Sequence, residues 1–81
     1  MRKHQLTSLG KELRVLRIKK NETIVDMAKK LNISYPMLSG IERGLNNFNM
    51  VLLDRLHEMY DLTDDQYVHL AYCMILSRKD I

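Results

Sequence analysis

The chain has 81 residues, of which 46% are hydrophobic and 28% are charged. This length provides for one domain with one modest core, and the composition excludes a disordered tail and a membrane protein. Met1 is not followed by the long apolar run of a secretory signal, and the single Cys73 cannot form an intramolecular disulfide. We therefore expect one cytoplasmic domain over residues 1–81.

The net charge of +3 is unevenly distributed along the chain. Residues 1–47 carry ten Lys and Arg side chains against four acids, whereas residues 48–81 carry three against six. A basic front half and an acidic back half indicate that one face meets a polyanion. An unevenly charged but merely solvated surface is the alternative interpretation.

Helical periodicity and capping residues predict five helices, and no alternating β-branched run supports a sheet. Their ranges are about 8–20 for the first, 23–44 for a pair of short helices, 49–60 for the fourth and 63–78 for the fifth. The inward side of the fourth is predicted to carry Leu52, Leu56 and Met59. The predicted fold class is all-α, a compact five-helix bundle.

Capping residues delimit the two short helices. Thr23 begins a sequence that resembles a capping box, and Asn32 is a turn residue that tolerates a left-handed backbone. Ser34 is a good cap for the next helix, Pro36 lies in its first turn, and Gly44 ends it. Two capped helices joined by a turn of about three residues are what a helix-turn-helix requires, with its second helix in the major groove.

The fifth predicted helix is unusually apolar, because His69 is the only polar residue between positions 67 and 76. The run is too short to cross a bilayer, and a helix packed on one side would be polar on the other. The core can be covered by four of these residues, Tyr67, Leu70, Ala71 and Met74. We expect a homodimer through the second face, which consists of Val68, Tyr72, Ile75 and Leu76. The alternative is an apolar tail folded back on the same core.

A characteristic set of residues runs through the middle of the chain: Met27-Ala28, Leu31, Ile33-Ser34, Leu38-Ser39 and Ile41-Glu42-Arg43-Gly44. With these residues the chain resembles the lambda-repressor-like, Cro/C1-type helix-turn-helix family, also called the XRE family, over about residues 8–70. The resemblance implies a five-helix bundle that binds a pseudo-palindromic operator in double-stranded DNA as a dimer. It also implies a recognition helix that begins near Ser34.

The resemblance further implies roles for individual residues. Arg17 and Glu42 occupy the positions of a partly buried ion pair that ties the first helix to the third. The residues placed to read bases are Ser34, Tyr35, Pro36, Met37, Ser39 and Gly40. The residues placed to contact phosphates are Thr23, Arg43, Asn46, Asn47, Lys19 and Lys20.

The recognition helix departs from the family pattern, in which Gln, Arg or Asn often pairs with base edges. This sequence has Tyr35 and Pro36 at the start of the helix and Gly40 further along. One interpretation is recognition through thymine methyls at Pro36 or Met37, through the Tyr35 hydroxyl and through DNA shape. The other is that this chain has partly lost sequence-specific binding.

These patterns favour a sequence-specific DNA-binding transcriptional regulator, and we expect a Cro- or C1-like repressor of phage or prophage type. A restriction–modification controller protein and an operon-autoregulating antitoxin are alternatives. From a different class, a helix-turn-helix scaffold that binds another regulatory protein, as an antirepressor or inhibitor, is also an alternative. The sequence has no nucleophile elbow, no glycine-rich phosphate loop and no His or Cys at metal-ligand spacing. It therefore predicts no enzyme, metal, cofactor or small-molecule substrate.

Overall fold

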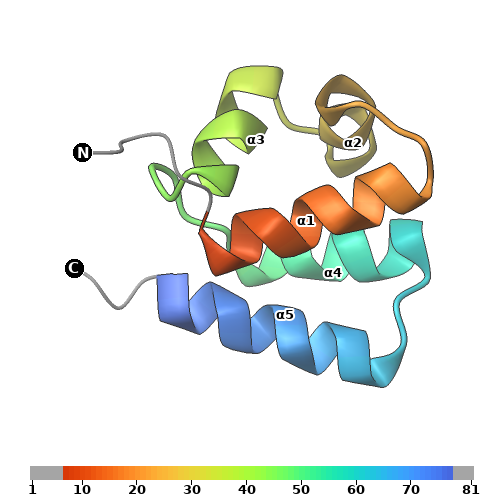
Figure 1. Cartoon of the computed structure of the whole chain (residues 1–81), viewed down its shortest axis with the longest axis vertical. Coiled ribbons are helices and arrows are strands. Elements are labelled where there is room, and N and C mark those ends of the chain that lie inside the picture. The colour runs from red at the N-terminus through yellow and green to blue at the C-terminus, as the bar shows by residue number, and fades with distance from the viewer. Residues whose placement is uncertain (1–6, 78–81) are drawn as a thin grey trace.

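The computed structural model describes residues 7–77, which form five α-helices and contain no strand (Figure 1). The helices are α1 (Ser8–Lys19), α2 (Ile24–Leu31), α3 (Tyr35–Glu42), α4 (Met50–Tyr60) and α5 (Asp64–Ser77). The predicted all-α fold is thus confirmed. The expected end of the last helix at residue 78 lies outside the described residues.

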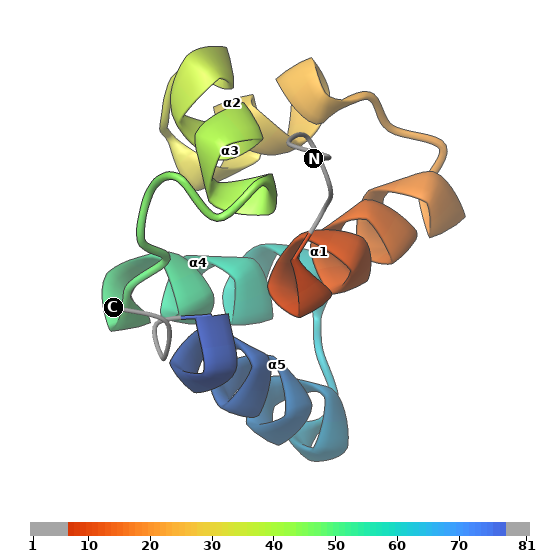
Figure 2. The same ribbon diagram turned by 60° about the vertical axis from the view of Figure 1, so that its left-hand side comes forward.

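The molecule measures 35 × 24 × 20 Å, and the helices are stacked one above another along its longest dimension (Figure 1). In both views α2 and α3 lie at one end and α5 lies at the other, with α1 and α4 between them (Figure 1, Figure 2). α1 packs against α5 on one side and against α3 on the other, while α4 contacts α2 and α5. α3 therefore lies at one end of the molecule, supported from below by α1.

The predicted caps set the limits of the two short helices. Thr23 Oγ1 accepts a hydrogen bond from the Asp26 backbone N–H (3.2 Å), and the Asp26 carboxylate accepts one from the Thr23 N–H (2.9 Å). Asn32 ends α2 in the left-handed conformation, with φ 60°. Ser34 caps α3, and Pro36 lies in its first turn. The predicted capped pair of helices is confirmed.

The core joins all five helices. The largest fully buried side chains come from α1 to α4, and α5 adds the buried Leu70, Cys73 and Met74; the former are Leu9, Leu13, Met27, Leu31, Leu38, Ile41, Leu53 and Leu56. Burial of each such aliphatic side chain contributes about 1.5–3 kcal/mol to folding. Phe48, in the loop between α3 and α4, is also buried and anchors this loop to the core.

The prediction that Met59 packs in the core is wrong, because its side chain is 48% exposed. α4 instead turns Tyr60 inward, where the phenol donates a hydrogen bond to the Glu22 carboxylate. Lys30 pairs with the same carboxylate, and its Nζ lies 4.9 Å from the centroid of the Tyr60 ring. An aromatic ring with a partner for its hydroxyl makes a better core residue than the neighbouring methionine.

The same cluster shifts two pKa values. Burial disfavours the charged Glu22 carboxylate, but hydrogen bonds from Lys30 and Tyr60, together with the Lys30 charge, outweigh it and lower the pKa of Glu22. Burial and the neighbouring Glu22 carboxylate raise the pKa of the Tyr60 phenol.

Among the residues that the structure describes, no helix has the length and apolar character needed to span a membrane.

Candidate nucleic-acid interface

The first turn of α3 points away from the core. Tyr35, Pro36 and Met37 are all exposed, and the Tyr35 side chain keeps 51% of its accessible surface. On the opposite side of the helix, Leu38 and Ile41 are fully buried. The predicted base-reading segment therefore projects three large side chains from a helix that the core holds in place.

Arg17 and Glu42 form the ion pair that the family resemblance implies. Arg17 Nε lies 3.3 Å from Glu42 Oε2, and its Nη2 lies 3.0 Å from Oε1. The two side chains are only 13% and 5% exposed, respectively. Two parallel contacts from a planar guanidinium fix direction as well as distance, so this pair orients the end of α3 relative to α1.

The backbone of Glu42 is also held, by the residue that caps α1. Its carbonyl accepts hydrogen bonds from the Thr7 N–H (3.1 Å) and the Thr7 hydroxyl (3.2 Å). Gly10 permits this approach, because an added Cβ there would lie 2.1 Å from the Glu42 carbonyl oxygen. The C-terminal end of α3 is therefore joined to α1 through both the side chain and the backbone of one residue.

Gly40, one of the predicted base-reading residues, was expected on the exposed side of α3, and this placement is wrong because Gly40 is buried. The loop after α3 folds back over it, and an added Cβ would lie 2.2 Å from Asn46 Nδ2. The same Nδ2 donates a hydrogen bond to the Met37 carbonyl (3.3 Å). Helical spacing alone places Gly40 outward, but it contains no information about the loop that covers this position.

The end of α3 and the following loop hold three of the predicted phosphate contacts, Arg43, Asn46 and Asn47, and the Asn46 amide is the one directed at the Met37 carbonyl. Arg43 is half-buried, and its Nε donates to the carbonyl of half-buried Ser39 (3.3 Å). Asn47 is exposed in the loop. This hydrogen bond uses Nε, the inner nitrogen of the guanidinium, and the two outer nitrogens carry further N–H donors.

The other predicted phosphate contacts are spread over two further elements. Thr23 is exposed at the beginning of α2, where its hydroxyl oxygen serves the capping box. Lys19 is exposed at the end of α1. Lys20 Nζ lies 6.0 Å from the centroid of the Tyr60 ring, which places this ammonium group at the C-terminal end of α4. The predicted residues thus come from the end of α1, the beginning of α2, the end of α3 and the loop that follows α3.

Sequence reasoning missed two exposed residues near α3. Leu45 is 72% exposed, and its backbone N–H donates to the Gly40 carbonyl (2.7 Å), so the loop presents it beside the helix. Arg14 is also exposed. It lies one turn from both Gly10 and Arg17 on α1, and this spacing places it on the flank that faces α3. In the sequence, the spacing of Arg14 from Gly10 is a signal that could have identified Arg14 as a residue on this flank.

The outer face of α3 carries no charged side chain. Glu42 is the only charged residue in the helix, and it is buried in its ion pair. Exposed cations lie instead on neighbouring elements, at Arg14 on α1 and Lys29 on α2. The bidentate Arg or Gln contacts that commonly read bases in a major groove are therefore not available from this helix.

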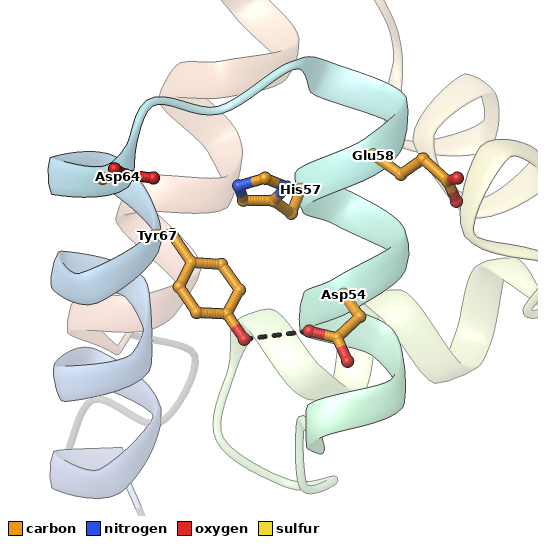
Figure 3. A pocket seen from close by; sticks show the side chains of 5 residues that line it. All are labelled: Asp54, His57, Glu58, Asp64 and Tyr67. Carbon is orange, nitrogen blue, oxygen red and sulfur yellow. Dashed lines mark hydrogen bonds between the residues drawn. The ribbon is translucent and has the colours of Figure 1, made fainter.

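A shallow hollow of about 560 Å³ between α4 and α5 has a different chemistry. It is lined by Asp54, His57, Glu58, Asp64 and Tyr67 (Figure 3). Tyr67 donates a hydrogen bond to Asp54 (2.9 Å), which raises the pKa of the phenol, whereas Glu58 points away from both. Three carboxylates disfavour a nucleic acid here, and the described residues hold no group of three ligands arranged for a metal ion.

A capped helix pair whose second helix is exposed at one end of a small helical bundle defines a helix-turn-helix DNA-binding domain. The chain matches the family model HTH_3, described as helix-turn-helix, over residues 13–67, and it belongs to this XRE, Cro/C1-type family. It is therefore a DNA-binding transcription regulator of the XRE type. Comparisons with curated proteins and with solved structures found no match.

Proposed function

We propose that this protein is a transcriptional repressor that binds an inverted-repeat operator as a homodimer, with one α3 in the major groove of each half-site. The observation that carries the proposal is the exposed first turn of α3, on a helix whose far end is tied to α1 through Glu42. Helices of this kind enter the groove with their N-terminal residues against the base edges.

Base recognition in this proposal is largely apolar. The Tyr35 hydroxyl hydrogen bonds to a base edge, Pro36 and Met37 contact thymine methyls, and sequence-dependent DNA shape supplies the remaining discrimination. The Ser34 and Ser39 hydroxyls lie at either end of this segment and are suited to short polar contacts with bases. Phosphates are contacted from the surrounding elements, by Thr23, Lys19, Arg43 and Asn47.

The apolar face of α5 supports the dimeric part of the proposal. Val68, Tyr72 and Ile75 follow one another at helical spacing, and all three are exposed, as is the neighbouring Leu76. A contiguous group of large apolar side chains on a small domain marks an interaction surface. A second copy is the proposed occupant, because two-fold symmetric proteins match the two halves of an inverted repeat.

Selection of bound duplexes from a random pool, at about physiological salt, tests the proposal. We expect enrichment of an inverted repeat whose half-sites lie about one helical turn, roughly 34 Å, apart. Tyr35→Ala should change the bases selected at one position in each half-site. Enrichment of a single, unrepeated site would contradict the homodimer, and an unchanged motif would contradict a reading role for Tyr35.

One observation favours a second candidate function, the protein-binding antirepressor or inhibitor. The outer face of α3 exposes apolar and neutral side chains without a single charge, a composition that also suits a protein interface. This candidate predicts DNA binding without sequence preference and stoichiometric binding of another regulatory protein. Failure to enrich any motif from the random pool would favour it over the repressor.

A further inference from the structure

We propose that Asn46 is a positioning residue for DNA binding, which acts through its contact with Gly40 and does not contact phosphate. The Gly40–Asn46 contact, in this proposal, fixes the loop of residues 43–47 beside α3 before DNA arrives. The inference rests on the proposed function, since it assigns a role within the same DNA-binding surface.

The Asn46 side chain closes onto α3 at a place where only glycine leaves room. An added Cβ at Gly40 would lie 2.2 Å from Asn46 Nδ2 and 3.0 Å from its Cγ, both well inside van der Waals contact. In the space that the missing Cβ leaves, Nδ2 donates its hydrogen bond to the Met37 carbonyl, at 3.3 Å. The amide is thus directed at the recognition helix.

Backbone hydrogen bonds complete the attachment of the loop. The N–H groups of Leu45 and Asn46 both donate to the Gly40 carbonyl, at 2.7 Å and 3.2 Å. The loop turns at Gly44, whose φ of 81° favours glycine. Three hydrogen bonds from two adjacent loop residues therefore converge on the stretch of α3 between Met37 and Gly40.

The consequence for binding is preorganisation. The loop carries Arg43, Leu45 and Asn47, which are the side chains that the structure places at the end of the recognition helix. A loop that is already ordered in the free protein does not lose conformational freedom when it meets the DNA backbone. Loss of the Gly40–Asn46 contact should therefore reduce affinity even though neither residue contacts DNA.

A double-mutant cycle tests this role. Wild type, Gly40→Ala, Asn46→Ala and the double variant are compared for affinity to the selected operator by fluorescence anisotropy, at a temperature where all are folded. We expect each single variant to lose about fivefold in affinity, as for one hydrogen bond, and the double variant to lose no more than either single variant. Additive losses in affinity would overturn the proposal.

Urea denaturation of the free proteins supplies a readout that needs no DNA. Gly40→Ala should raise the urea midpoint in the Asn46→Ala background, because alanine is the better helix former, but not in wild type, where its Cβ displaces Asn46. The urea measurement reports the Gly40–Asn46 contact even if no operator is selected and the proposed function fails. Coupling in urea without coupling in affinity would overturn the positioning role.

Two controls separate positioning from simpler effects. Asn47→Ala removes the neighbouring amide of the same loop, and its effect on affinity should add to that of Gly40→Ala. Thr63→Ala removes the cap of α5, far from α3, and should lower the urea midpoint while leaving affinity unchanged. Asn46→Ala with lower affinity but an unchanged urea midpoint would indicate a direct DNA contact and overturn the proposal.

Discussion

Glu42 joins two elements at the scale of a single residue. Its carboxylate binds Arg17, and its carbonyl oxygen binds Thr7, so one residue ties α3 both to α1 and to the residue that caps α1. A buried ion pair of this kind gains little over two apolar side chains. Removal of one partner is nevertheless costly, because it leaves the other charge buried without compensation.

We expect Glu42→Ala to lower the free energy of unfolding by about 3 kcal/mol, because Arg17 would remain largely buried without its partner. Urea denaturation measures the loss. Glu58→Ala, which removes an exposed acid from α4, is the matched control and should change stability by less than about 0.5 kcal/mol. Equal effects of the two substitutions would contradict the orienting role of the ion pair.

Arg43 is expected to act on DNA affinity without changing sequence preference. Its guanidinium extends from the end of α3, where its Nε is held by the Ser39 carbonyl. Arg43→Ala should weaken binding to all duplexes and reduce the slope of log affinity against log salt by about one unit, the contribution of one phosphate contact. Titrations with an operator and with an unrelated duplex at several salt concentrations measure both effects. An unchanged slope would remove Arg43 from the phosphate contacts.

The helical elements were predictable because their limits are local. Thr23, Ser34 and Asn32 act within one turn of their own position, and the structure uses each as the sequence indicates. Gly40 and Met59 were misplaced because their environments depend on segments outside their own helices. A loop covers Gly40, and the partner of Tyr60 lies on the segment before α2. Helical spacing gives a face to each residue but does not say which segment packs on that face.

The capping box of α2 has a pH dependence with a defined sign. Hydrogen bonds from the Thr23 N–H and hydroxyl are the main causes that lower the pKa of Asp26. Folding thus lowers the pKa of this carboxyl, and its charged form stabilises the fold at pH values above the unfolded-state pKa, near 3.9. This contribution to stability is lost as the pH falls through the folded-state pKa.

We therefore expect Asp26→Asn to be less stable than wild type at pH 7, and the difference to shrink as the pH falls below about 4. Urea denaturation of the two proteins over this pH range measures the change, and taking their difference removes the titration of the other acids. A difference that stays constant with pH would show that the charge of Asp26 does not contribute to the cap.

In the folded molecule, the basic front half and the acidic back half of the sequence lie in different parts of the structure. The basic front half contains α1 to α3, and three of the six acidic residues of the back half line the hollow between α4 and α5 (Figure 3). A polyanion is attracted to one end of the molecule and repelled from the other. We therefore expect this field to orient the protein on DNA with α3 toward the groove and α5 away from it.

The apolar face of α5 is expected to hold two copies together. Val68→Glu places a charge on this face and should reduce the mass measured by light scattering from that of a dimer to that of one chain, because an unpaired charge is costly in an apolar interface. Val51→Glu is a matched control on α4, since the two valines are 64% and 60% exposed. A wild-type protein that is monomeric at micromolar concentration would contradict the proposed interface.

The attachment of Glu42 to α1 also determines which part of the chain can work in isolation. Its hydrogen bonds to Thr7 and Arg17 span 35 and 25 residues of sequence. A synthetic peptide that contains only α2, the turn and α3 would lack both partners, and its recognition helix would have neither a fixed end nor a fixed direction. We therefore expect that the smallest fragment able to present α3 to DNA begins before α1 and is larger than the helix-turn-helix itself.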